Sequence, residues 1–135
     1  MVNSGANLLV RGEKSAATAT VVALSADFPP PLITRTAGTD VDLPALDRGT
    51  LVIHDVDSLD LSAQRILLTW LEARTSRVRV ITTVTRDLFA MVTAGVFLDQ
   101  LYYRLNTIVV DAVGGDERSA PKLKYRISPP GPRRS

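Results

Sequence analysis

A short apolar segment that ends abruptly in charge constrains the fold of this chain most. Leu51, Val52 and Ile53 form a continuous apolar run, and His54 and Asp55 follow it directly. Such a run is typical of a strand in a parallel sheet that is covered on both faces. Ligands of open α/β sheets bind outside the carboxyl ends of the strands. The segment therefore predicts a buried strand whose terminal histidine and aspartate lie at the edge where a site would form.

Further apolar segments alternate with helical patterns along the chain. We expect other strands at 8–10, 32–36, 77–83 and 105–110, and helices at 15–24, 60–74, 86–93 and 96–104. Ser15 is the expected N-cap of the first helix, and residues 39–48 form a short connection with helical character. This alternation indicates an α/β fold, a three-layer sandwich with a mainly parallel five-stranded sheet.

The helix expected at 60–74 has the strongest pattern in the chain. Apolar residues recur at three- and four-residue spacing on one face: Ala63, Ile66, Leu67, Trp70 and Leu71. Polar residues fall mostly elsewhere: Gln64, Arg65, Glu72 and Arg74. We therefore expect Trp70 to fill the core.

Composition excludes several classes of site. The 135 residues include no cysteine and one histidine, so thiol chemistry, disulfides and multi-histidine metal sites are excluded. No apolar run approaches the roughly 18 residues that cross a bilayer. The expectation is a cytoplasmic protein with no membrane partner.

Charge divides the chain unevenly. Residues 116–135 carry six basic and two acidic side chains, although the net charge of the whole chain is only +2. We expect a flexible N-terminus at 1–7, a core at 8–113 and a flexible basic tail at 114–135. We expect the tail to be a solvated end of the chain, and nucleic-acid contact through it is the alternative.

Three segments together resemble the AAA+ domain of bacterial sigma-54-dependent transcriptional activators, the enhancer-binding proteins. Residues 49–56, with Leu59 and 64–71, are similar to the Walker B strand of that family and the helix after it. Residues 79–88 are similar to its sensor I strand and turn. Residues 95–106, Gly-Val-Phe-Leu-Asp-Gln-Leu-Tyr-Tyr-Arg-Leu-Asn, are similar to its arginine-finger helix. The resemblance implies a P-loop NTPase-like sheet and a place in transcription regulation.

The phosphate loop of that family is altered in this chain. In the family, Gly-Glu-x-Gly-x-Gly-Lys wraps backbone amides around phosphates. Gly12 and Glu13 match its start, but the two inner glycines are Ser15 and Ala17 here. Alanine does not readily adopt the positive-φ backbone that glycine supplies. We expect an ordinary strand–turn–helix, with a weak anion site at the helix N-terminus as the alternative.

The lysine of that loop, which reaches the terminal phosphates, is also displaced. Thr18 stands at its position, and Lys14 comes several residues too early. Lys14 would have to reach back to contact a phosphate.

The Walker B acids are changed as well. The family's Asp-Glu pair holds magnesium and polarises the attacking water, and His54 and Asp55 take the two positions. Magnesium prefers oxygen ligands to a neutral imidazole, and aspartate is one methylene shorter than glutamate. We expect His54 to be a strand-end residue that hydrogen-bonds its neighbours. A metal or pH-sensing pair with Asp55 or Asp57 is the alternative.

Two further catalytic elements are incomplete. Val84 and Thr85 replace the Thr-Asn pair of sensor I, and Thr85 alone can still hydrogen-bond. Leu98 replaces the first of the two finger arginines, and Arg104 retains the second. An arginine finger acts on a γ-phosphate. Without a γ-phosphate to act on, we expect Arg104 to make a structural ion pair.

The resemblance, with these changes, predicts a non-catalytic sigma-54-activator-like domain that binds a protein partner in transcription control. The Gly-Ala-Phe-Thr-Gly-Ala loop that contacts sigma-54 in the family is missing, and the helical lid and the helix-turn-helix domain are expected to be absent. We expect no metal and no cofactor, and a monomer or weak dimer. The alternative is a weak ATP-binding domain or slow ATPase that uses Lys14, Asp55 and Arg104 with magnesium.

Overall fold

The computed structural model describes residues 7–74, 77–113 and 122–127, the last stretch by its backbone alone. The elements follow one another as β1 (Leu8–Arg11), α1 (Lys14–Ser25), β2 (Leu32–Thr36), β3 (Gly49–His54), the 3-10 turn η1 (Val56–Ser58), α2 (Leu61–Glu72), β4 (Val78–Val84), α3 (Leu88–Thr93), α4 (Asp99–Leu105), β5 (Ile108–Val113) and β6 (Lys122–Ile127). Strands β1 to β5 and helices α1 to α4 follow one another in the order that the sequence predicts.

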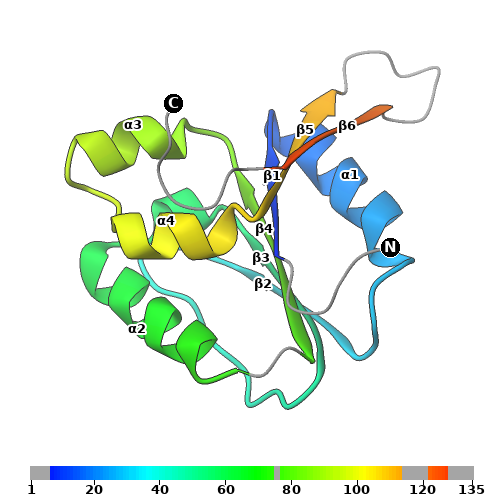
Figure 1. Ribbon diagram of the computed structural model, residues 1–135, viewed down its shortest axis with the longest axis horizontal. Coiled ribbons are helices and arrows are strands. Elements are labelled where there is room, and N and C mark those ends of the chain that lie inside the picture. Colours follow the sequence, from blue (N-terminus) through cyan, green and yellow to red (C-terminus); the bar gives the residue numbers. More distant parts are fainter. Residues whose placement is uncertain (1–6, 75–76, 114–121, 128–135) are drawn as a thin grey trace.

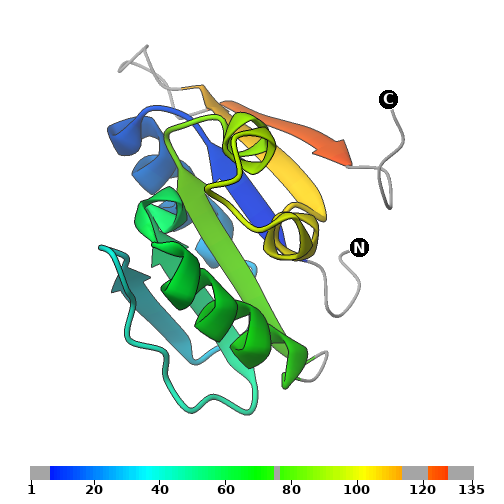
Figure 2. The same ribbon diagram turned by 90° about the vertical axis from the view of Figure 1, so that its left-hand side faces the viewer.

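The strands form one sheet in the order β2-β3-β4-β1-β5-β6. The first five strands in that order pair in parallel, and β6 pairs with β5 antiparallel. Helix α1 covers one face of the sheet, and α2, α3 and α4 cover the other (Figures 1 and 2). The predicted fold class, a three-layer α/β sandwich with a mainly parallel sheet, is confirmed.

Each face of the sheet has its own apolar core. Beneath α2 and α4 the core includes Leu51, Ile53 and Leu67, each fully buried. Beneath α1 it includes Val52 and Ile81, also fully buried. Successive side chains of β3 therefore enter opposite cores, which explains why the strand is apolar without interruption.

The structure corrects three expectations about secondary structure. Residues 39–48 contain no helix. Helix α1 is capped by Glu13 rather than Ser15, because it begins at Lys14. A sixth strand, β6, lies within the stretch expected to be a flexible tail, where backbone pairing with the free edge of β5 stabilises it. The rest of that tail and residues 1–6 lie outside the described residues.

The buried face of α2 differs from the predicted one. Ile66 is 60% exposed, whereas Gln64 is fully buried. Trp70 is half-buried at the margin of the core, so it does not fill the interior. The sequence pattern missed these positions because a neighbouring loop, described below, supplies hydrogen-bond partners for Gln64.

Within the described residues, no helix has the length and apolar character that crossing a membrane requires.

Candidate functional site

The first turn of α1 occupies the place of a phosphate loop. Gly12 begins the strand–helix connection with φ +151°, and a Cβ there would lie 2.9 Å from the Ala112 carbonyl oxygen. A side chain is therefore excluded by both backbone conformation and space. Two residues later the helix begins, at Lys14. Residues that would form an open loop are instead helical.

The side chain of Glu13 caps this helix. Its Oε1 accepts hydrogen bonds from the backbone N–H of Ala16 at 3.1 Å and from the Ser15 hydroxyl at 2.7 Å. The backbone N–H of Ala17 donates to the Glu13 carbonyl oxygen at 2.8 Å. The Ser15 hydroxyl, then the Ala16 and Ser15 amides, lower the pKa of Glu13. A carboxylate of the chain itself thus uses donors that could otherwise bind an anion.

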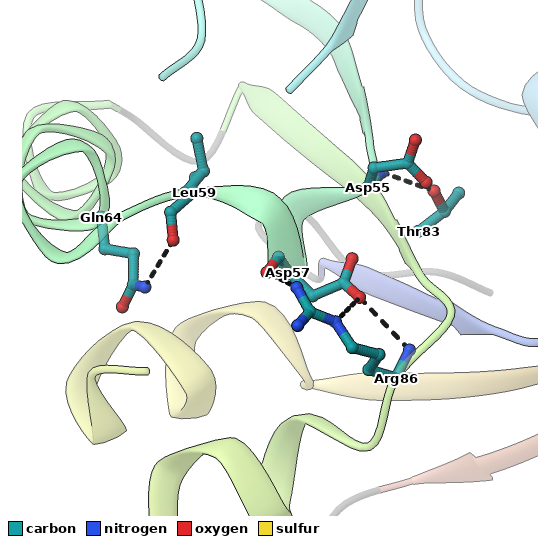
Figure 3. Close-up of polar contacts among 6 residues, drawn as sticks. All are labelled: Asp55, Asp57, Leu59, Gln64, Thr83 and Arg86. Atoms are coloured by element: carbon teal, nitrogen blue, oxygen red, sulfur yellow. Dashed lines mark hydrogen bonds and ion pairs between the residues drawn. The ribbon is translucent and has the colours of Figure 1, made fainter. Parts of the chain in front are cut away.

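Lys14 points from this turn to the end of β3. Its Nζ lies 3.4 Å from Oδ2 of Asp55. Asp55 has a left-handed backbone, φ 62°, and its N–H donates to the Thr83 hydroxyl at 3.0 Å (Figure 3). The acidic group at the Walker B position therefore faces a cation supplied by the same chain.

His54 lies half-buried at the end of β3. Its Nδ1 is 3.4 Å from the Thr83 hydroxyl oxygen, which agrees with the expected strand-end residue bonded to a neighbour. Burial lowers the pKa of His54; Asp55 opposes this change and Lys14 reinforces it. Imidazole is therefore favoured over imidazolium at this edge of the sheet.

The free energy of unfolding is expected to fall as pH drops through about 6.5, the ordinary pKa of histidine. His54 binds a proton more weakly in the folded state than in the unfolded chain. Its contribution is fully present above 6.5 and is lost below it, as the unfolded chain takes up the proton first. NMR titration can measure the folded pKa directly, because the chain has one histidine. A folded pKa at or above 6.5 would contradict this expectation.

Three other residues predicted for the site do not join this group. The Thr18 hydroxyl donates to the Lys14 carbonyl oxygen at 2.9 Å, inside α1. Thr85 is exposed after β4, and Arg104 is exposed in the last turn of α4. Within the described part of the chain the Arg104 guanidinium has no hydrogen bond or ion pair, so the structural ion pair expected for it is not found. Among the predicted residues of the described chain, Lys14 meets Asp55 next to His54, and Glu13 stays on the first turn of α1.

A buried carboxylate next to this edge was not predicted as a structural contact. Asp57 is 3% exposed, and its Oδ2 accepts from the backbone N–H and the Nε of Arg86 at 3.2 and 3.1 Å. The Arg86 guanidinium also donates to the Asp57 carbonyl oxygen (Figure 3). These bonds join η1 to the turn after β4. The sequence signal was an aspartate just beyond a buried strand, but its partner lies 29 residues away.

Gln64 forms a second junction. Its Nε2 donates to the carbonyl oxygens of Leu59 and Val96, both at 3.0 Å, and its Oε1 accepts from the N–H of Leu98 at 2.8 Å. The side chain thus fastens α2 to the loop that leads into α4. No pattern within the helix reveals this, since two of the partners are more than 30 residues distant.

The fold of this chain is similar to that of several solved structures. The ATP complex of NtrX from Brucella abortus matches with TM-score 0.57 and 17% identity over 81% of this chain and 32% of that one. A structure described as the P-loop NTPase domain of the sigma-54 transport activator from E. coli matches with TM-score 0.57 and 12% identity, over 84% of this chain and 87% of that one. The chain thus spans about a third of the NtrX structure.

The fold also extends beyond these proteins. A DNA polymerase III gamma subunit-related protein from Thermotoga maritima matches with TM-score 0.54 and 17% identity, over 85% of this chain and 43% of that one. At such identities the likeness concerns the fold alone. No curated protein matches this chain.

Family assignment comes from the sequence match. The model described as "Sigma-54 interaction domain" matches residues 5–113, which include β1 to β5 and helices α1 to α4. This agrees with the resemblance seen in the Walker B, sensor I and finger segments. The chain belongs to the sigma-54 interaction domain family.

Proposed function

We propose that this domain is a non-catalytic member of its family that acts by binding a protein in transcription regulation. The observation that carries the proposal is that α1 begins at Lys14, so the residues that match the family's open loop are helical. The Glu13 carboxylate caps this early turn, where a nucleotide phosphate would need free amide donors. A phosphate at this position would face a negative charge and would have to displace bonds already made.

The metal-binding side of the site supports the same proposal. The Lys14 ammonium lies 3.4 Å from the Asp55 carboxylate and balances its charge. Partial burial favours the neutral form of His54 at the other acidic position of the family. Neutral imidazole is a poor ligand for magnesium. Loss of several groups that act together in phosphoryl transfer leaves little catalysis, although their effects do not add.

The second candidate is a weak ATP-binding domain. The specific observation in its favour is that Lys14 and Asp55, two of the residues it would use, meet at one edge of the sheet. ATP with magnesium would then have to separate the pair and displace the Glu13 cap. Arg104 is exposed and could be offered to a neighbouring subunit only if that nucleotide were present.

Thermal unfolding with ATP and magnesium separates the two candidates. We expect the midpoint to stay unchanged up to 10 mM MgATP, because no site accepts the nucleotide. A site with a Kd of about 1 mM would instead stabilise the fold by about 1.4 kcal/mol and raise the midpoint by roughly 3–6 °C. Lys14→Gln serves as the matched control. A rise that saturates in the native chain and vanishes in this variant would establish the weak ATP binder.

Partner binding needs its own measurement. The family description makes sigma-54 the first protein to test, with contact through a surface other than the missing loop. Calorimetry of the full chain with purified sigma-54, with and without MgATP, should give the same affinity in both conditions. An affinity that depends on MgATP would count against the non-catalytic proposal.

A further inference from the structure

The outward face of α2 carries one exposed apolar side chain and a second that packs only partly against the core. Ile66 is 60% exposed, and Trp70 is half-buried beside it. With Arg65 and Thr69 they line an open pocket of about 390 Å³. Helix α2 lies in front of the sheet in the view of Figure 2. Ile66 therefore projects next to a hollow in the same face.

Trp70 is held in place rather than free to move. Its Nε1 donates to the Pro44 carbonyl oxygen at 2.9 Å, and the guanidinium of Arg74 lies 4.6 Å from its ring centroid. Arg74 is itself bonded to the Leu46 carbonyl oxygen at 3.3 Å. Because the Trp70 side chain is already fixed, little side-chain entropy is lost when an apolar group packs against its ring.

Two side chains of opposite charge lie along one edge of this face, so the edge can pair with the same edge of a second copy. Arg65 and Glu72 are both exposed and stand seven residues apart, so they lie on the same side of α2, about 10.5 Å apart along its axis. A two-fold axis perpendicular to α2, passing beside the middle of the helix, would bring the arginine of each copy opposite the glutamate of the other. Two identical ion pairs would form across one contact.

We propose that this face is the contact between two copies of the chain, with their α2 helices packed antiparallel across a two-fold axis. In that arrangement Ile66 of each copy enters the pocket beside Trp70 of the other, and each Arg65 pairs with Glu72 of the second copy. An isologous contact requires this kind of reciprocity. The Arg74 side chains fall at opposite ends of the contact, so they do not repel one another.

The contact is limited to about one helix length, because α2 has 12 residues. We expect a contact of that length to bury less than the roughly 1,200 Å² typical of stable complexes, so the dimer should be weak and concentration-dependent. The inference does not rest on the absence of catalysis, since α2 is remote from the Glu13 cap. It goes beyond the proposed function by naming the surface and its occupant.

Sedimentation equilibrium of the full chain tests the proposal. At low salt, rising concentration up to about 1 mM should shift the native chain from monomer towards dimer. Ile66→Glu should keep it monomeric across the same range. Val22→Glu is the matched control, since Val22 is 67% exposed on α1, across the sheet, and should leave dimerisation unchanged. Circular dichroism checks that each variant is folded.

A charge exchange tests the orientation. Arg65→Glu and Glu72→Arg should each weaken dimerisation by about tenfold, because each creates two like-charge contacts. The double variant should restore the native dissociation constant. Three outcomes would overturn the proposal: a native chain that stays monomeric at 1 mM, a dimer that persists in Ile66→Glu, or a double variant no better than the single ones. The last outcome would fit a foreign partner or another orientation on this face.

Discussion

Replacing Gln64 with methionine is expected to lower the free energy of unfolding by about 3–5 kcal/mol, as a fully buried residue that makes three hydrogen bonds is lost. Methionine has a similar length and keeps the packing volume, so a cavity contributes little. The cost comes from leaving the Leu59 and Val96 carbonyls and the Leu98 amide without partners. Denaturant unfolding of both proteins measures the difference.

Gln100→Met provides the matched control for this change. Gln100 is exposed on α4, so the same substitution there should alter stability by no more than about 0.5 kcal/mol. If Gln64→Met were as mild as Gln100→Met, the loop before α4 would have to be fastened by something other than this side chain.

Replacing Asp57 with alanine is expected to cost about 2–3 kcal/mol. The change leaves the Arg86 amide without its acceptor and removes a carboxylate bond to the guanidinium. The value is below that of a fully buried ion pair, since the Arg86 side chain is 59% exposed and water screens its charge. One carboxylate oxygen, Oδ1, has no hydrogen-bond partner in the described part of the chain, which reduces the net benefit further.

A control variant and a double-mutant cycle complete the Asp57 experiment. Asp42→Ala should change stability little, because the Asp42 side chain is 88% exposed. Arg86→Ala alone and with Asp57→Ala completes a double-mutant cycle, in which the guanidinium and carboxylate should show a coupling of about 1 kcal/mol. Zero coupling would mean that Asp57 acts only through the backbone amide of Arg86.

Local patterns predicted most of the elements because those patterns report burial directly. The apolar run of β3 is continuous since its side chains enter two cores, and that continuity is visible in the sequence. The strand and helix alternation was enough to predict a parallel sheet. The Walker B, sensor I and finger segments were enough to predict the family that the match over residues 5–113 establishes.

The sequence predicted which residues lie near the candidate site, but not the contacts that they make there. The sequence placed Glu13, Lys14, His54 and Asp55 near one sheet edge, through the family's motifs. It did not predict that Glu13 would cap α1, because the start of a helix is chosen among several competing N-caps by the geometry of the turn before it. The salt bridge from Lys14 to Asp55 follows from that early start.

The sequence by itself determined the order of strands and helices, the two-sided burial of β3 and the family, because each rests on residues close together in the chain or on a recognisable motif. Tertiary structure alone decided that Gln64 faces inward and Ile66 outward, that Asp57 meets Arg86, and that β6 adds to the edge of β5. The physical reason is the same in each case. A polar group can be buried only where another segment supplies its hydrogen-bond partner, and segments distant in sequence become neighbours only when the sheet assembles.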